Sequence, residues 1–309
     1  MQHRSPVGRP RGPSYVVLFG VVVALAAPAF AGLLATPSMP HPPAFPQLPA
    51  GNTAAFSFAA HTRPSATGVH SQNWGGFVAV PATSGKVDEA YAEWHVAPIT
   101  CPASLTNPTY HLTWVGIDGW TTNTVEQAGT FDYCSGAGAT PLYYSWWEFF
   151  PYNAIQLMGN VSAGDLVQSY VLYNPTVCHG THCGVYTLDF ADLSSGYNFS
   201  IVGNPSTCAI SPFTGSTACQ SGNDTSAECI SEAVYFSSGY APISKYTNLS
   251  FANCIASIGG SLRGIGAFTT LLKVTTIGSV TGGVIQSPGI LTAGYWKKSD
   301  FAVTWKGYD

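Results

Sequence analysis

Short runs of alternating apolar and polar residues, rich in β-branched and aromatic side chains, recur along the chain from residue 73 onward. Gly, Pro, Asn and Ser separate these runs at positions typical of turns. We find no long amphipathic helical stretch and no internal repeat in the sequence. This pattern predicts an antiparallel β-sandwich or barrel. The predicted strands are Val87–Val96, Thr109–Ile117, Leu142–Phe150, Ser169–Tyr173, Val185–Phe190, Glu228–Phe236, Leu271–Thr276 and Phe301–Trp305.

The region before these strands has a different composition. Residues 1–31 have the basic start, the apolar run over Val16–Ala27 and the small-residue cleavage site of a secretory signal. The apolar run is short for a transmembrane helix, so an uncleaved membrane anchor is the less favoured alternative. Residues 32–70 are rich in proline and small residues, which indicates a linker or a short propeptide. We therefore expect a secreted, extracellular protein with a β-sandwich domain over residues 71–309.

Charged side chains are scarce along the whole chain. They make up 8% of the residues, against roughly 25% in an ordinary globular protein. The formal net charge of -4 and the scattered basic residues argue against a nucleic-acid partner. A surface with few charges changes little when carboxylates are protonated, so it suits an acidic medium. A glycosylated surface is the alternative, and acceptor sequons occur at Asn160, Asn198, Asn223 and Asn248.

Eight cysteines, an even number, follow the export signal. This combination favours disulfides, although it does not determine their pairing. Cys178 and Cys183 enclose His-Gly-Thr-His, a loop whose two thiols and two imidazoles could bind zinc. A hairpin closed by a local disulfide is favoured over zinc, because strand-like runs flank the loop on both sides.

A carboxylate between two glycines ends the apolar run Trp114–Gly119. Glycine supplies backbone freedom and a short acid side chain bonds to nearby amides, so the segment predicts a strand that enters a tight turn at Asp118. Gln127 follows as a neutral amide, with Gly129 just behind it. Alone, this pattern indicates only a turn between two strands.

Three acidic side chains lie on the same predicted strand faces as large apolar groups. Glu228 and Glu232 share one face of a strand, and Glu148 lies among aromatic residues on another. Desolvation and the mutual repulsion of Glu228 and Glu232 should raise the pKa of at least one of them. Perturbed carboxylates favour a functional site, with a solvated strand face as the alternative. The apolar neighbours are Ile230, Val234 and Phe236 on the first face, and Tyr144, Trp146 and Phe150 on the second.

Several other chemistries lack their motifs in this chain. The sequence contains no His-Glu-x-x-His zinc motif, no Gly-x-Ser-x-Gly elbow and no glycine-rich phosphate loop. It also lacks the Asp-Thr-Gly or Asp-Ser-Gly pair of pepsin-like aspartic proteases. A Ser/His/Asp triad has few candidates, because four of the eight histidines precede the predicted domain.

Taken together, the motifs resemble those of the glutamic peptidases, the eqolisin or G1 family of acid-acting endopeptidases. Trp114–Gly119 matches the family's Trp-Val-Gly-Ile-Asp-Gly, and Ala227–Glu232 resembles its Ala-Glu-Trp-Ile-Val-Glu. The matches occur in order along the chain, which makes the set more specific than any single motif. The other matching segments are Asn73–Gly76, Glu93–Pro98, Glu126–Gly129, Trp146–Pro151 and Phe301–Trp305.

The resemblance implies a concanavalin A-like sandwich of two antiparallel sheets with a concave substrate-binding face. It also implies a catalytic glutamine and glutamate, which correspond to Gln127 and Glu232, with Glu228 as the fallback for the glutamate. The residues that match groups lining or supporting the family's site are Trp114, Asp118, Trp146 and Glu148. The chain departs from the family pattern at Tyr144, Phe150 and Cys229, which puts substrate preference and disulfide pairing in doubt more than the chemistry.

The implied chemistry needs no metal or organic cofactor. An ionised Glu232 would take a proton from an attacking water and pass it to the leaving nitrogen, while Gln127 holds the water and the developing oxyanion. We therefore expect a monomeric acid endopeptidase whose partners are protein or peptide substrates. A carbohydrate-binding or carbohydrate-active sandwich is the alternative, because many aromatic residues and paired carboxylates suit sugars. A catalytically inactive adhesion module is the third.

Overall fold

The computed structural model of the chain describes residues 69–308, except for 83–84, 105–106, 151–155, 180–181, 205–208, 212–221, 237–238 and 279–280. The first strand, β1 (Val69–Ser71), begins two residues before the expected domain boundary, and the rest of the predicted signal and linker lies outside the described residues. Within the described ranges, no helix is long and apolar enough to cross a membrane.

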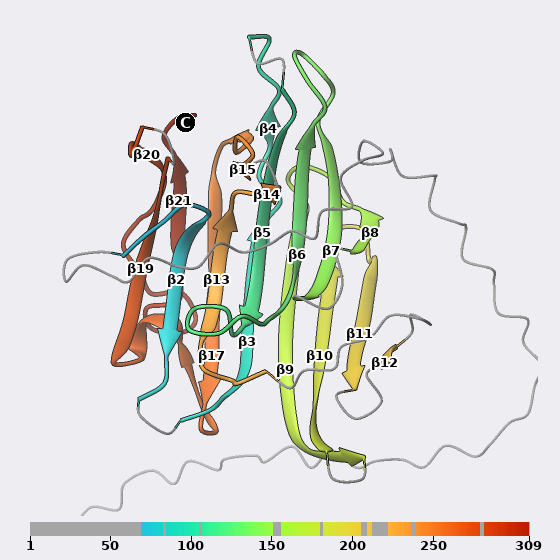
Figure 1. Ribbon diagram of the computed structural model, residues 1–309, viewed down its shortest axis with the longest axis vertical. Helices are drawn as coiled ribbons and strands as arrows, with labels where there is room; N and C mark the ends of the chain where they lie inside the picture. Colours follow the sequence, from blue (N-terminus) through green and yellow to red (C-terminus); the bar gives the residue numbers. More distant parts are fainter. Residues whose placement is uncertain are drawn as a thin grey trace, which may run out of the picture. The chain divides into compact units, whose positions relative to one another are not determined.

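Seventeen of the described strands pair in one continuous network, which folds into two layers whose strands run side by side in Figure 1. In the first sheet each neighbouring pair is antiparallel. Its order is β8 (Gln156–Asn160), β7 (Leu142–Phe150), β6 (Val125–Cys134), β5 (Thr109–Ile117), β13 (Ala227–Glu232), β2 (Trp74–Val80), β19 (Thr270–Ile277) and β20 (Val284–Pro288). Strand β1 runs parallel to β19.

The second sheet is also antiparallel and joins the first at one edge, where β20 pairs with both β19 and β21. Its order is β12 (Ala209–Ser211), β11 (Asn198–Asn204), β10 (His182–Asp192), β9 (Leu166–His179), β3 (Val87–His95) and β17 (Leu249–Ile258), with β21 (Phe301–Trp305) and β18 (Ser261–Gly264) on the far edge of β17. The small elements are β4 (Ile99–Thr100) with β16 (Lys245–Tyr246), β14 (Tyr235–Phe236) with β15 (Gly239–Tyr240), and the 3₁₀ turn Ile265–Ala267.

Each of the eight predicted runs overlaps a strand, so the predicted antiparallel sandwich is confirmed. The run Glu228–Phe236 is not one strand, because β13 ends at Glu232 and Tyr235–Phe236 pairs with β15 outside the main sheets. The predicted runs missed several strands, among them β2, β6, β8, β11, β17 and β20. Strand β6 carries polar side chains on both faces, yet nearly all of it is buried, so alternation did not mark it.

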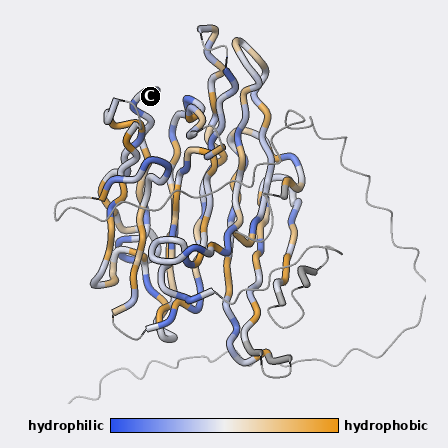
Figure 2. Tube along the Cα trace, in the orientation of Figure 1, coloured by the Kyte–Doolittle hydropathy of each residue, from blue (hydrophilic) through white to orange (hydrophobic). Residues whose placement is uncertain are grey.

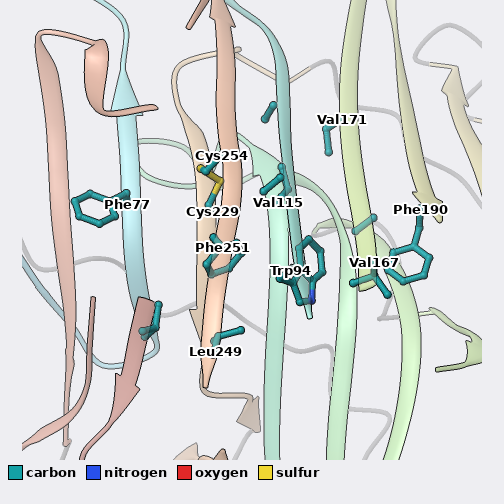
Figure 3. Packing of buried hydrophobic residues seen from close by; sticks show 14 of the residues in the cluster. Phe77, Trp94, Val115, Val167, Val171, Phe190, Cys229, Leu249, Phe251 and Cys254 are labelled. Carbon is teal, nitrogen blue, oxygen red and sulfur yellow. A yellow bond between two sulfur atoms is a disulfide. The ribbon is translucent and has the colours of Figure 1, made fainter. Parts of the chain in front are cut away.

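The main core lies between the two sheets and contains residues from both (Figure 3). Trp94 of β3 packs against Phe251 of β17, whose ring stacks on Phe301 of β21. Orange and blue segments alternate along the strands in Figure 2, as expected when successive side chains point to opposite faces of a sheet. Because of this alternation, the first sheet has a second face that points away from the main core and carries several polar side chains.

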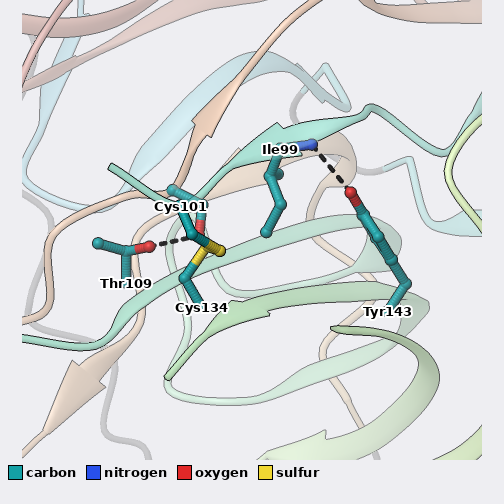
Figure 4. Close-up of a disulfide and its surroundings, with 6 residues drawn as sticks. Ile99, Cys101, Thr109, Cys134 and Tyr143 are labelled. Carbon is teal, nitrogen blue, oxygen red and sulfur yellow. Dashed lines mark hydrogen bonds between the residues drawn. A yellow bond between two sulfur atoms is a disulfide. The ribbon is translucent and has the colours of Figure 1, made fainter. Parts of the chain in front are cut away.

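Two disulfides join elements of the described chain. Cys229 of β13 is bonded to Cys254 of β17 and so links the two sheets (Figure 3). Cys101, just after β4, is bonded to Cys134 at the end of β6, close to the hydrogen bond that the Ile99 amide donates to the Tyr143 hydroxyl (Figure 4). Both bonds fit an oxidising compartment.

The tight approach of β5 and β6 generates a first prediction. A Cβ atom at Gly129 would lie 2.0 Å from the Thr113 carbonyl oxygen and 2.7 Å from the Cα of Trp114. The variant Gly129→Ala should therefore lose about 1–3 kcal/mol of unfolding free energy through overpacking, measured by urea denaturation. Gly307→Ala is the control, because no heavy atom lies within 4 Å of its Cβ position. Equal stability of the two variants would contradict the prediction.

Candidate active site

The face of the first sheet that points away from the main core holds a second cluster of large apolar side chains. It includes Trp74, Trp114, Trp146, Phe131 and Ile230, and all five are buried. Polar side chains interrupt this cluster at a few positions, and strand register decides which of them are neighbours. The result is a set of carboxyl and amide groups in surroundings from which water is largely excluded.

Three cross-strand rows describe this face, each running through β13, β5, β6 and β7. The first row contains Glu228, Gly116, Gln127 and Glu148. The second contains Ile230, Trp114, Gly129 and Trp146. The third contains Glu232, Leu112, Phe131 and Tyr144. The two glycines beside Trp114 leave room for its indole, since a Cβ at Gly116 would lie 2.7 Å from the Trp114 ring.

Gln127 is held by Glu148. Its Nε2 donates to Glu148 Oε2 over 2.9 Å, and both side chains are buried. Burial, with the nearby charge of Glu232 adding to it, raises the pKa of Glu148 well above its usual value, and the Gln127 hydrogen bond opposes the rise. The Gln127 Oε1 atom has no hydrogen-bond partner among the described residues. This arrangement leaves an amide oxygen and one amide hydrogen available to a bound molecule.

Glu232 receives a hydrogen bond on each carboxyl oxygen. The Trp114 indole Nε1 donates to Oε2 over 2.6 Å, and the Asn73 Nδ2 donates to Oε1 over 3.0 Å. Asn73 is itself oriented by the Ser71 hydroxyl, which donates to its Oδ1. Burial raises the pKa of Glu232 to about 8, with the hydrogen bonds from Trp114, Asn73 and Trp74 working in the opposite direction.

This raised pKa favours a neutral Glu232 in acid, in contrast to the ionised side chain expected from the sequence. Burial among aromatic side chains disfavours the charged carboxylate more than its N–H donors favour it. Glu148 is neutral there for the same reason. The face therefore holds two protonated carboxyl groups and a neutral amide at acidic pH.

Glu228, the fallback for the glutamate, has a different environment. It lies in the row of Gln127, but the ring of Trp114 lies against Gly116, the residue between them. Burial raises its pKa well above the usual value, with the charge of Asp118 adding to the rise and the nearby Ser226 hydroxyl only partly opposing it. Neither Glu228 oxygen accepts a well-formed hydrogen bond from a described residue. Glu232 is the better supported of the two.

Asp118 supports the site from a distance. Its backbone has a φ of 71°, a left-handed conformation that aspartate tolerates better than most residues. Its carboxylate accepts hydrogen bonds from the amides of Asn223, Asp224 and Thr225 at 2.6–2.9 Å, and from the Thr225 hydroxyl. These residues lead directly into β13, so Asp118 anchors the strand that carries both glutamates.

A group of acids surrounds this anchor on the inner side of the sheet. Burial raises the pKa of Glu126 well above its usual value, and the charges of Asp118, Asp224 and Glu228 add to the rise. Burial likewise raises the pKa of Asp224 to about 6, against the opposing effects of its hydrogen bond from Tyr186 and its ion pair with Lys86. These acids hold protons that exposed carboxyls would release.

The inner face of the first sheet also holds a Ser, a His and an Asp in hydrogen-bonding order. His111 Nε2 lies 2.8 Å from Ser231 Oγ, and His111 Nδ1 lies 2.8 Å from Asp132 Oδ2. The sequence had suggested few candidates for such a triad. All three side chains are buried between the sheets, and Ser231 donates its hydroxyl to Gln286 instead of to His111. This arrangement offers no activated hydroxyl for nucleophilic catalysis.

The structure thus separates the residues predicted for the site. One face of the first sheet holds most of them, whereas Asp118 acts through the loop before β13. The residues on that face are Gln127, Glu148, Trp114, Trp146, Glu228 and Glu232. Sequence reasoning missed the hydrogen bond from Asn73 to Glu232, because 159 positions separate the two residues. The motif Asn73–Gly76 contained the residue but not its partner.

The sequence predicted a hairpin around Cys178 and Cys183, with a zinc site as the alternative. Strands β9 and β10 form the predicted hairpin, while the side chains of Cys178 and Cys183 lie outside the described set. Elsewhere in the described ranges, no group of three or more His, Cys, Asp or Glu side chains could hold a metal ion.

Comparison with solved structures agrees with the fold. The fold is similar to that of scytalido-glutamic peptidase bound to a transition state analog inhibitor, with a TM-score of 0.54 and 19% identity over 76% of this chain and 98% of that one. It is also similar to SCP-B, an eqolisin in complex with the tripeptide Ala-Ile-His, with a TM-score of 0.53 and 18% identity over the same shares. A search of curated protein sequences found no match.

The sequence itself establishes the relationship more firmly than these folds do. A family model described as the Peptidase A4 family matches residues 72–287, which include Asn73, Gln127, Glu148 and Glu232. The chain therefore belongs to the Peptidase A4 family, the glutamic peptidases or eqolisins, which are endopeptidases.

Proposed function

We propose that this protein is a secreted endopeptidase that cleaves protein and peptide substrates in acid, with Gln127 and Glu232 as its catalytic residues. The observation that carries the proposal is the environment of Glu232. This carboxyl group accepts one N–H donor on each oxygen and lies on the same sheet face as Gln127, which is itself held by Glu148. The tripeptide and the transition state analog bound by related peptidases support a peptide as substrate.

The protonated Glu232 suits a mechanism in which one carboxyl group both gives and takes a proton. As a water attacks the scissile carbonyl carbon, the Glu232 O–H protonates the carbonyl oxygen and the other carboxyl oxygen takes the water proton. Trp114 and Asn73 donate to different oxygens of this carboxyl group, which orients the two oxygens for the exchange. The product of the first step is a neutral tetrahedral diol, and Glu232 remains protonated.

The second step breaks the C–N bond by the same exchange. Glu232 donates its proton to the amide nitrogen and recovers one from a hydroxyl of the diol, which releases an amine and a carboxylic acid. Gln127 can hold the attacking water with Oε1 and polarise the scissile carbonyl oxygen with its second Nε2 hydrogen. No step draws on a metal or an organic cofactor.

Secretion is supported by the same features in sequence and structure. The N-terminal segment has the composition of an export signal, and the described chain contains two disulfides. All four sequon asparagines are exposed, so each is accessible to glycosylation in a cell that performs it.

The catalytic assignment is tested by cleavage of a denatured protein across about pH 2–7. Both Glu232→Gln and Gln127→Ala should lose at least about 100-fold in kcat/KM, because one removes the proton relay and the other the donor to the scissile carbonyl oxygen. Glu93→Gln on the second sheet is the matched control and should retain activity. Pepstatin and EDTA should have no effect.

The other outcomes of this experiment are also informative. Loss of activity in Glu228→Gln with full activity in Glu232→Gln would move the proton relay to Glu228. Absence of cleavage by a folded sample at every pH would contradict the proposal and favour an inactive module. Sugar binding that survives Glu232→Gln would favour a carbohydrate-binding protein.

The environment of Glu232 generates a prediction for the pH profile. Because the Asn73 hydrogen bond favours the ionised form of Glu232, Asn73→Ala should raise the pKa of Glu232 further and move the basic limb of kcat/KM to higher pH. The limb in Tyr91→Phe, a variant remote from Glu232, should not move. A limb that shifts to lower pH in Asn73→Ala would be inconsistent with a protonated Glu232 as the active form.

The buried acids generate a prediction for stability. The folded pKa values of Glu126, Glu148, Glu228, Asp224 and Glu232 are raised, so the native state keeps protons that the unfolded chain releases above about pH 4. Stability should therefore be full below about pH 4 and fall as the pH rises through about 6 and 8, measured as unfolding free energy in urea. Glu126→Gln should reduce the fall. Higher stability at neutral than at acidic pH would refute this account.

A further inference from the structure

The buried chain of Asp132, His111, Ser231 and Gln286 lies directly behind the strand segment that carries Glu232. Gln286 of β20 donates from Nε2 to the Ser231 carbonyl oxygen over 2.7 Å and to the Thr276 hydroxyl oxygen over 2.8 Å. The ring of Tyr246 stacks on His111 with a centroid distance of 4.4 Å. All of these side chains are buried, so each hydrogen has to be assigned to a partner within the network.

The orientation of Gln286 is determined by the main chain. A carbonyl oxygen only accepts, so the atom facing the Ser231 carbonyl must be the amide nitrogen of Gln286. The other amide atom, Oε1, is then an acceptor. It receives the hydroxyl hydrogens of Ser231, over 2.6 Å, and of Tyr246, over 2.8 Å.

This orientation uses the only hydroxyl hydrogen of Ser231. The contact of 2.8 Å between Ser231 Oγ and His111 Nε2 must therefore contain a hydrogen on Nε2. The contact of 2.8 Å between His111 Nδ1 and Asp132 Oδ2 needs a second proton, either on Nδ1 with an ionised Asp132 or on Asp132 itself. In both cases His111 and Asp132 together carry two protons and no net charge.

The surroundings favour an uncharged pair. Burial raises the pKa of Asp132, with the hydrogen bond and the charge of His111 opposing the rise. The titratable side chains that face the pair from neighbouring strands are Tyr143 of β7 and Tyr246 of β16, and both are neutral phenols with raised pKa values because of burial. The flanking Thr113 and Thr130 carry no charge.

We propose that His111 and Asp132 form a doubly protonated, charge-neutral pair that positions the Ser231–Glu232 backbone, and that loss of its second proton releases this support as the pH rises. Without that proton, the Ser231 hydrogen would have to serve both His111 and Gln286. One of the two contacts would then place lone pairs against each other, and Gln286 would lose its fixed position beneath the Ser231 carbonyl. This inference goes beyond the proposed peptidase function, since it concerns a network that touches no substrate.

The substitution Asp132→Asn tests the proton count. An asparagine amide can donate to Nδ1 of a neutral His111 whose Nε2 keeps its hydrogen, so the whole network survives without an ionisable proton. We expect this variant to fold and to lose less unfolding free energy than wild type between about pH 5 and about pH 8. Asp88→Asn is the matched control, because Asp88 accepts bonds from Ser257 and Gly260 outside the network, and its profile should parallel wild type.

The opposite arrangement gives a different result. If Asp132 were ionised and His111 carried hydrogen only on Nδ1, as in a catalytic triad, the new asparagine would present its amide oxygen to Nδ1–H, because Asp132 Oδ1 has no hydrogen-bond partner among the described residues that would oppose this rotation. The pair would then bind the same number of protons in both folded proteins, the pH profiles of Asp132→Asn and wild type would run parallel above about pH 5, and the inference would be wrong.

A spectroscopic measurement decides the question even if the variant fails to fold. The measurement uses NMR spectra of wild-type protein labelled with ¹⁵N in histidine and ¹³C in aspartate. The spectra are recorded at about pH 7.5, which is above the ordinary histidine pKa of ~6.5. We expect hydrogen on Nε2 of His111 together with a second proton on Nδ1 or on Asp132. A bare Nε2 with an ionised Asp132 would overturn the inference, whatever the outcome of the cleavage experiments.

Discussion

The register of β5 between β13 and β6 is the constraint on which the rest of the site depends. This strand is buried along its whole length, with one face toward the second sheet and the other toward the aromatic cluster. Shifting it by one residue would exchange the two faces, and Trp114 could no longer reach Glu232. The close approach of Gly129 to Trp114 holds this register, because a larger residue would push β6 away.

Burial of acidic groups is the second theme, and it explains the unusual composition. A chain with only 15 acids places Glu126, Glu148, Glu228 and Glu232 where water is excluded, and each keeps a raised pKa as a result. Such groups cost little free energy while they are protonated and much more once they ionise. The fold and the proposed chemistry thus favour the same acidic conditions for a single physical reason.

The two faces of the first sheet give residues that are adjacent in sequence different surroundings. Ser231 and Glu232 are adjacent in sequence but point to opposite faces. Glu232 accepts N–H donors on the face that also holds Gln127, whereas Ser231 contacts His111 and Gln286 between the sheets. A Ser, a His and an Asp in hydrogen-bonding distance do not make a nucleophile when the hydroxyl hydrogen is committed elsewhere.

The sequence alone determined the sandwich, because runs of β-branched and aromatic residues between turn signals admit few other folds, and its ordered motifs identified the family. Local patterns also marked Glu148, Glu228 and Glu232, since they placed these acids beside apolar groups, whereas Gln127 was marked by the resemblance to the glutamic peptidases. Tertiary structure decided the rest: that β6 is a strand despite its polar residues, that Asp118 anchors a loop, that Asn73 reaches Glu232, and that burial raises the pKa of Glu232. Each of these depends on contacts between residues far apart in the chain, and on the burial that those contacts create, which no local pattern contains.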